Sequence, residues 1–351
     1  MPTSGVSSAN DTPRHHDRMP MDAVLRSLEP FWFPVLPSAN LKDKPTAVTV
    51  LGRSVVLWRD RDGHPAALEN RCRHRSAALS DGHVDGAGRL HCPYHGWIFA
   101  EDGRCLQIPQ QPDLPLSQRF NVPTYRCAEH CGQIWISLHD SPRLPLPQFA
   151  RADDQQFRLI QGFYEVWNCS PFRVIENGLD NFHHHFVHQG ILNVPSPIPE
   201  PIEGPITTTA DGLEFRIPLL LHNTSTLEAT IDSGMERLKV QRTVRWIAPL
   251  GLTLDLDWPN GKKQTIALFA TPKDASSCTI LRFYWRNDSE ADVKSDDVIA
   301  FERALIDQDR CILEAMPKGL DPWPADELLI EADQPIAKMR QLLQKFLQTS
   351  S

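Results

Sequence analysis

The sequence lacks the long apolar runs and the positive charge that would assign it to a membrane or to nucleic acid. No apolar run reaches the roughly 18 residues needed to span a bilayer. The formal net charge is −8, from 36 basic and 44 acidic residues, whereas phosphate backbones are bound by basic surfaces. We therefore expect neither a membrane nor a nucleic acid as the partner of this chain.

Cysteine is also sparse, with eight residues in a chain of 351. Small secreted domains that depend on disulfides have a much higher density of cysteine. Residues 1–22 lack the apolar core segment of a secretory signal peptide, and we expect them to form a disordered tail. These observations favour a reducing compartment, so we expect a cytoplasmic protein.

The pattern of apolar residues predicts two domains after this tail. Short β-rich runs occur throughout residues 23–145, for example on either side of a turn at Gly52-Arg53, and they predict an all-β domain. A proline-rich segment, 142–149, reads as a linker. Residues 146–351 combine helical stretches at about 174–187, 298–316 and 335–347 with strand-like runs. This combination predicts an α+β domain in which helices pack on an antiparallel sheet.

A paired pattern of cysteine and histidine lies inside the predicted all-β domain. It consists of Cys72-x-His74 and Cys92-x-x-His95, with seventeen residues between His74 and Cys92. Two Cys and two His can hold structural zinc, but zinc fingers group the Cys together and the His together. Here each half contributes one of each, which favours a [2Fe–2S] cluster with two Cys on one iron and two His on the other.

The residues around these ligands support the cluster. Pro93 stiffens the second loop, Gly96 permits a close approach of the backbone, and Trp97 can pack beneath the cluster. With these flanks, "CRHR" and "CPYHGW" closely resemble the motif of the Rieske non-heme iron oxygenases. The other six cysteines match no ligand position and read as inert thiols.

The resemblance implies a second metal, a mononuclear Fe(II) held by two His and one carboxylate. Asn177, Asp180, His183 and His188 fit the family's spacing in the stretch 176–188. His183 and His188 are the implied iron ligands, and Asn177 and Asp180 the implied catalytic residues. In the family the matching Asp links the iron to a Rieske histidine of the neighbouring subunit in a ring-shaped homotrimer.

The spacing of the two histidines has a consequence for the local fold. Five residues turn about 140° on a straight helix, so the rings of His183 and His188 would not converge. We therefore expect a distorted or broken helix, such as a π-bulge, in this stretch. His184 and His185 are adjacent alternatives, and the choice among them rests on the family spacing alone.

The carboxylate ligand is expected from the helical stretch 301–316, which offers Glu302, Asp307, Asp309 and Glu314. On a helical wheel Asp309 lies at about 80°, inside the apolar arc that runs from Phe301 at 0° to about 140°. Asp307 and Glu314 fall on the polar side, and Glu302 is read as an acid at the start of the helix with a capping role. Asp309 also matches the family's late Asp, so both arguments select it.

The resemblance implies the activity of a terminal oxygenase that uses O₂ and electrons from a ferredoxin or flavin reductase. Such an enzyme hydroxylates a small organic substrate or removes an N- or O-methyl group. An aromatic-ring dihydroxylating dioxygenase is the alternative. A Rieske electron carrier without catalysis is a third hypothesis, but a carrier needs only the first domain.

Two further expectations concern surfaces. The substrate pocket is expected along the sheet between about residues 201 and 285, without an acid or arginine that stands out as an anchor. Candidates for its lining are Trp246, Leu254, Leu256, Trp258, Phe269 and Phe283. Arginines around the cluster ligands form a candidate docking face for an acidic electron donor, namely Arg71, Arg73, Arg75, Arg89 and Arg104.

Overall fold

The computed structural model of the protein describes residues 20–324 and 326–348. The expected disordered tail therefore lies outside the described residues, apart from its last three. Two of those three begin the helix α1 (Met21–Leu28). Within the described ranges, no helix has the length and apolar composition needed to cross a membrane.

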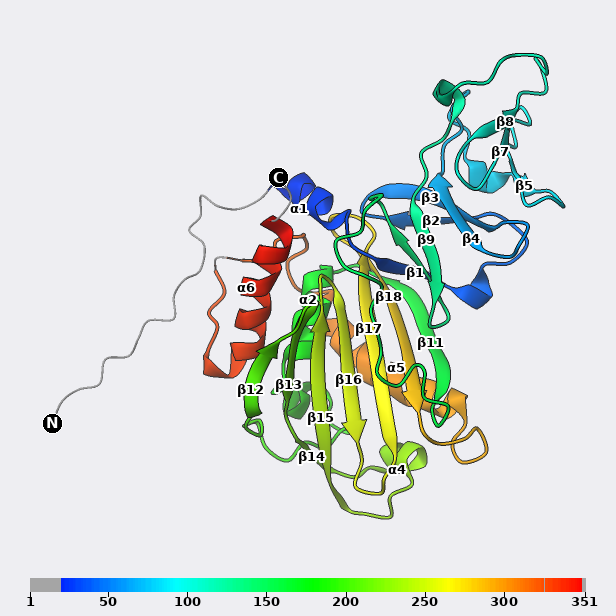
Figure 1. Cartoon of the computed structure of the whole chain (residues 1–351). Helices are drawn as coiled ribbons and strands as arrows, with labels where there is room; N and C mark the ends of the chain where they lie inside the picture. Colours follow the sequence, from blue (N-terminus) through cyan, green and yellow to red (C-terminus); the bar gives the residue numbers. More distant parts are fainter. Residues whose placement is uncertain (1–19, 325, 349–351) are drawn as a thin grey trace.

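The N-terminal part consists of three small antiparallel sheets, at the upper right of Figure 1. Their strand orders are β1-β10-β9, β2-β3-β4 and β5-β6-β7-β8. The strands are β1 (Phe33–Pro37), β2 (Thr46–Val50), β3 (Arg53–Arg59), β4 (Pro65–Glu69), β5 (His83–Val84), β6 (Leu90–His91), β7 (Ile98–Phe99), β8 (Cys105–Gln107), β9 (Arg126–His130) and β10 (Gln133–Ser137). Three single-turn 3₁₀ helices interrupt them: η1 (Ser38–Asn40), η2 (Leu79–Asp81) and η3 (Gln118–Phe120). This arrangement confirms the predicted all-β fold.

The hairpin between β2 and β3 illustrates how the sequence specifies these sheets. Val50 pairs with Arg53, so Leu51 and Gly52 form a two-residue turn. Both have positive φ, at 50° and 74°, as the favoured hairpin turn requires. Glycine adopts this conformation without the clash that a Cβ would create.

The C-terminal part is built on an eight-stranded antiparallel sheet in the order β11-β18-β17-β16-β15-β13-β12, with β14 also paired to β15. Its strands are β11 (Arg158–Trp167), β12 (Glu203–Thr208), β13 (Gly212–Arg216), β14 (Leu219–His222), β15 (Arg237–Ile247), β16 (Gly251–Asp257), β17 (Lys263–Pro272) and β18 (Cys278–Arg286). Its helices are α2 (Pro171–Leu179), α3 (His184–Val187), α4 (Ser225–Ile231), α5 (Ser295–Leu313), η4 (Glu331–Asp333) and α6 (Gln334–Gln348). The predicted α+β class is confirmed.

Both faces of the central strands are covered. Leu268 and Ala270 of β17 pack with Phe172 of α2, whereas Ala267 and Phe269 pack on the opposite face. Alternation along the strand sends successive side chains to opposite faces, so β17 is buried on both sides. The helices α2 and α5 lie behind the sheet in Figure 1.

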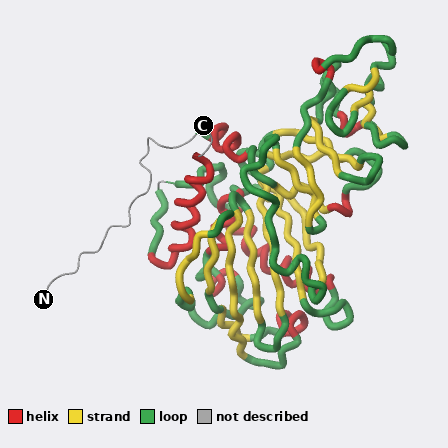
Figure 2. The backbone as a smooth tube through the Cα atoms, in the orientation of Figure 1, coloured by secondary structure: helices red, strands yellow, loops and turns green. Residues whose placement is uncertain are grey.

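The proline-rich segment 142–149 is more than a connection. Figure 2 shows the loop between β10 and β11 running along the face of the sheet that the helices leave free. Phe149 is 6% exposed and packs against Phe283 and Trp285 of β18, and Trp135 of β10 joins the same cluster. This aromatic cluster joins the two parts of the chain.

The helix predicted at 174–187 is broken, as the spacing of its histidines required. It ends at Leu179, and Asp180 has extended backbone with ψ 132° before α3 begins. The cause is not a π-bulge. Asp180 Oδ1 accepts hydrogen bonds from the N–H groups of Phe182 (2.8 Å) and His183 (3.3 Å), so its side chain takes over donors that a continuous helix would use.

Candidate metal centres

Two loops of the same conformation hold the predicted cluster ligands. In the first, Cys72 N–H donates to Ala77 O (2.9 Å), and Ser76 N–H donates to Cys72 O (3.0 Å). In the second, Cys92 N–H donates to Trp97 O (2.8 Å) and Gly96 N–H to Cys92 O (3.1 Å). The fifth residue of each loop, Ser76 or Gly96, has positive φ, at 59° and 68°. Glycine therefore suits position 96 because the backbone there is left-handed. This reason differs from the close approach of the backbone that was inferred from the sequence.

The four side chains of these loops converge with the thiols inside and the imidazoles outside. Cys72 and Cys92 are 2% and 4% exposed, whereas His74 is exposed and His95 half-buried. The Nδ1 atoms of His74 and His95 are 3.1 Å apart. Trp97 is buried in the same hydrophobic cluster as Cys72 and Cys92. It stacks on His74, with ring centroids 4.9 Å apart and an interplanar angle of 5°.

The chemistry of this donor set fits a Rieske cluster. Burial is the largest effect on the Cys72 thiol and raises its pKa to about 12. A thiolate at that position therefore needs the positive charge of a metal. Two buried sulfurs on one side and two imidazole nitrogens on the other match the two inequivalent irons of such a cluster.

The three side chains predicted to hold the mononuclear iron also come together. One ligand atom from each of His183, His188 and Asp309 lies within 4.8 Å of the others. Asp309 Oδ1 is 3.6 Å from His183 Nε2 and 3.4 Å from His188 Nε2. Two imidazoles and one carboxylate on one side of a metal suit non-heme iron and leave other positions open.

Two of the three have a hydrogen-bonded neighbour that orients them, and the third has a carboxylate nearby. His188 Nδ1 is 3.1 Å from Gln308 Oε1, and Asn177 Nδ2 donates to Asp309 Oδ1 at 3.4 Å. His183 Nδ1 lies 3.6 Å from Asp180 Oδ1, just beyond hydrogen-bond distance. Such outer contacts fix the orientation of metal ligands. The sequence analysis missed Gln308, although it stands beside Asp309 in the chain.

Asp180 carries a charge beside this centre. Burial raises the pKa of its carboxyl, but the neighbouring His183 and the two N–H groups that it accepts more than offset this, and the net pKa is lowered. The contact with His183 joins residues only three positions apart in the chain. It arises from the non-helical turn that precedes α3, in which Asp180 Oδ1 accepts the N–H groups of Phe182 and His183.

The adjacent histidines do not join the three ligands. His185 Nδ1 contacts Val194 O at 2.7 Å. His184 Nδ1 lies 3.2 Å from Asn181 O, and its Nε2 is 3.4 Å from Arg242 Nη1. Burial lowers the pKa of His184 well below its usual value, so its ring is neutral. Its Nδ1 donates a hydrogen bond to Asn181 O, and its Nε2 accepts one from Arg242 Nη1.

The acids of α5 are placed partly as predicted. The side chain of Asp309 is 12% exposed and that of Asp307 is 51% exposed. The reading of Glu302 is wrong, because α5 begins seven residues earlier, at Ser295. Glu302 is 3% exposed and forms an ion pair with Arg282. The apolar arc is also narrower than predicted, since Ile312, which falls near 20° on the same wheel, is 44% exposed.

The three iron-ligand candidates line a mainly apolar cavity of about 110 Å³. Leu254, Leu256 and Trp258 contribute to its wall, as predicted. Trp246, Phe269 and Phe283 do not line it and belong to the packed core. The expectation that no acid or arginine would stand out is wrong. Charged and amide side chains in the wall are Arg242, Gln264, Arg282, Arg286 and Glu302.

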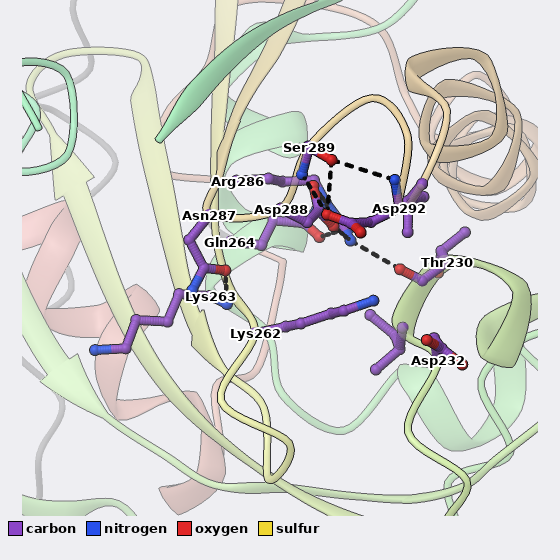
Figure 3. Close-up of polar contacts among 12 residues, drawn as sticks. Thr230, Asp232, Lys262, Lys263, Gln264, Arg286, Asn287, Asp288, Ser289 and Asp292 are labelled. Carbon is purple, nitrogen blue, oxygen red and sulfur yellow. Dashed lines mark hydrogen bonds and ion pairs between the residues drawn. The ribbon is translucent and has the colours of Figure 1, made fainter. Parts of the chain in front are cut away.

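Four of these polar residues form a hydrogen-bonded chain along the cavity. Arg286 pairs with Asp288 and donates to Gln264 Oε1 (2.8 Å) and to Thr230 O (2.7 Å), contacts that Figure 3 shows. Gln264 Nε2 donates to Glu302 Oε1 at 2.8 Å, and Glu302 pairs with Arg282. Each buried arginine in this chain therefore contacts a carboxylate, as burial of charge requires.

Comparisons with known proteins identify the family of both parts of the chain. A model of the Rieske [2Fe-2S] domain matches residues 31–126, and a model of the vanillate O-demethylase oxygenase C-terminal domain matches residues 167–349. Methylxanthine N1-demethylase NdmA of Pseudomonas putida is 28% identical over 91% of this chain and 89% of its own. Methylxanthine N3-demethylase NdmB of the same organism is 30% identical over 85% of this chain and 82% of its own. The solved structure of NdmA with caffeine has a TM-score of 0.79 at 26% identity and covers 92% of each chain.

Proposed function

Because the chain belongs to the Rieske non-heme iron oxygenases, we propose that it hydroxylates or oxidatively demethylates a small organic substrate at an iron held by His183, His188 and Asp309. As a member of that family it is an oxidoreductase, the terminal oxygenase of a Rieske system. Its Rieske domain implies a [2Fe–2S] cluster. Cys72, His74, Cys92 and His95 are the residues that we assign to it.

The observation that carries the proposal is the position of the three ligands in the wall of the cavity. Iron bound there supplies the activation of O₂, with electrons delivered through the Rieske centre. The rest of the site is provided by the chain. Gln308 and Asn177 hold His188 and Asp309 in orientation, and the leucines of β14 and β16 exclude water from the substrate.

Removal of a methyl group is the reaction we favour within this class. The two Pseudomonas putida relatives are N-demethylases by name, and the C-terminal family model is described by an O-demethylase. Both reactions begin with oxidation at a methyl carbon next to nitrogen or oxygen. The wall next to the iron ligands is apolar enough to receive such a methyl group, with Leu252, Leu254 and Leu305 in it.

The proposal is tested by a product screen. Purified enzyme with a reductase, O₂ and N- or O-methyl compounds is expected to release formaldehyde and the demethylated product. Product formation is the readout because electron consumption alone also arises from uncoupled turnover. The same preparation is expected to contain three irons per chain, two in the cluster and one at His183, His188 and Asp309. If the preparation contains two irons per chain and forms no product from any compound, the proposal is wrong and the electron-carrier hypothesis is favoured.

The arginines near the cluster do not all contribute to one basic face. Arg89 pairs with Asp85 at 2.6 Å and Arg104 with Asp102 at 2.6 Å. Arg71 and Arg73 are exposed and bond to neutral oxygens, of Ser76 and Asn121. Arg75 is exposed, and its positive charge is near enough to His95 to help lower the pKa of that imidazole. We infer that an acidic electron donor approaches on the side of Arg71, Arg73 and Arg75.

Charge reversal at Arg75 is expected to raise the apparent KM for the electron donor by about threefold to tenfold at low salt, because it weakens electrostatic steering. The effect should fade above roughly 0.5 M salt, where the screening length is only a few ångströms. Arg237→Glu is the matched control, since it makes the same charge change at an exposed position on β15. If the two variants raise the KM equally, the effect comes from the net charge of the protein and not from a docking face. If the donor kinetics do not depend on salt, the proposed docking face is wrong.

A further inference from the structure

We propose that Arg242 anchors the substrate in this cavity and that the substrate is a small organic acid, bound through its carboxylate. The proposal rests on the function proposed above and adds to it the chemical class of the molecule. It concerns a residue of β15 that is not a metal ligand and that the sequence analysis passed over.

Arg242 has donors to spare inside the protein. It is 4% exposed and lines the cavity. Its Nη2 donates to Asn181 Oδ1 at 2.6 Å, and its Nη1 lies 3.4 Å from His184 Nε2. A guanidinium has five N–H donors, and these contacts use two of them. Its Nε is buried without a partner in the described part of the chain.

The charge of Arg242 is not matched by contact with a carboxylate. Arg282 pairs with Glu302, and Arg286 pairs with Asp288. For Arg242, no carboxylate of the described residues lies within ion-pair distance. Burial lowers its pKa to about 10, opposed by the charge of Asp180, so the group remains a cation at neutral pH. A buried cation without a carboxylate in contact is costly, and an anion bound in the cavity relieves that cost.

The other unpartnered polar atoms of the wall point to the same chemistry. Trp258 Nε1 and Arg282 Nε are buried donors without partners in the described residues. The acceptor oxygens of Glu302 are already bonded to Gln264 and Arg282. His183 Nδ1 is a further unpartnered atom, and it belongs to the iron site. The cavity thus offers hydrogen-bond donors and requires a ligand that supplies acceptors.

The position of Arg242 places such a ligand next to the iron ligands. Arg242 contacts His184, and the ring of His184 stacks on that of His183 with centroids 4.2 Å apart. A carboxylate held by Arg242 therefore leaves the rest of a small molecule between the apolar side chains of Leu219, Leu254 and Leu256. A molecule of this kind has one charged end and an apolar body.

The test is a binding measurement on the holoenzyme that requires no turnover. The probes are small aromatic and aliphatic carboxylic acids, each paired with its primary amide, for example 4-methoxybenzoate with 4-methoxybenzamide, together with caffeine as a neutral carbonyl compound. Isothermal titration is expected to show the best acid binding about 10- to 100-fold more tightly than its amide. Arg242→Gln should reduce that ratio to within about twofold while leaving the amide's affinity unchanged. Arg237→Gln, on the same strand and exposed, should keep the wild-type ratio.

The results that would overturn the proposal are distinct. If no acid binds more tightly than its amide, or if caffeine binds more tightly than every acid, the substrate is not an organic acid. If Arg242→Gln weakens acid and amide equally, the residue only supports the turn at Asn181 and His184. Should that variant lose its metals, Arg242→Lys, which keeps the positive charge, is expected to retain a preference for the acid. If instead the proposed function is wrong, no product forms, although the acid still binds more tightly than its amide.

Discussion

Replacing Asp309 by alanine is expected to abolish product formation and to remove the mononuclear iron, while the [2Fe–2S] cluster is kept. Asp309 Oδ1 is within 3.6 Å of both His183 Nε2 and His188 Nε2, and it is the carboxylate of that group of three. Removal of a residue that merely supports a metal ligand already weakens affinity or activity by about 10- to 100-fold. Loss of the ligand itself should exceed the upper end of that range. The cluster ligands lie on two loops of the N-terminal part, far from α5 in the chain, so the visible absorption of the cluster should be unchanged.

Asp307→Ala is the matched control for this variant. It removes the same carboxylate from the same helix, two residues away, where the side chain is 51% exposed and its ion pair with Arg303 is long, at 4.0 Å. An exposed pair of this kind contributes little to stability. We expect three irons per chain and wild-type turnover from Asp307→Ala. Iron loss from Asp307→Ala, with iron retained by Asp309→Ala, would overturn the assignment.

Replacing Asp180 by asparagine is expected to leave both metal centres in place and to slow electron transfer between them by at least about 100-fold, at the upper end of what residues behind a metal ligand contribute. We propose that Asp180 bridges His183 to a Rieske histidine of a neighbouring subunit. His183 Nδ1 has no hydrogen-bond partner among the described residues, and Asp180 Oδ1 stands 3.6 Å away. Asparagine keeps an oxygen that can accept the N–H groups of Phe182 and His183, so the local fold should survive while the charge is lost.

The measurement is a single turnover. Reduced enzyme is mixed with substrate and O₂, and reoxidation of the cluster is followed by its absorbance. Asp307→Asn, which removes a charge at an exposed position, should reoxidise at the wild-type rate. The bridging role implies a head-to-tail assembly closed as a trimer. Wild-type reoxidation by Asp180→Asn would rule out the bridge, and a fully active monomer in sedimentation would rule out the path between subunits.

Periodicity explains which site residues the sequence reveals. Asp309 can be found from the sequence because a carboxylate inside the apolar arc of a helix is costly to bury unless it is paired or binds a metal. The break before α3 can be inferred because five residues cannot bring His183 and His188 together on a straight helix. Its form cannot be inferred in the same way. It depends on the side chain of Asp180 accepting two particular N–H groups.

Other residues are missed because their partners are distant in sequence. From the sequence Glu302 reads as a helix cap, because the apolar pattern begins several residues after the start of α5. Its ion-pair partner Arg282 comes from β18, which is distant in sequence. Gln308 contacts His188 across 120 residues. Arg242 did leave a signal. It continues the alternation of buried Leu238, Val240, Val244 and Trp246 along β15, so a strand with one buried face places an arginine inside.

The two cluster loops have a further consequence for how the protein acquires its cofactor. Each loop is closed by hydrogen bonds that span at most six residues, from Cys72 to Ala77 and from Cys92 to Trp97. Contacts this close in sequence have little loop-closure entropy to overcome and form quickly. We therefore expect the backbone to set the ligand conformation before the metal binds. In zinc-finger domains, by contrast, metal binding drives folding itself. Here a protein that delivers the cluster would bind ligand loops that are already folded. Insertion of the cluster then does not require the chain to fold around it.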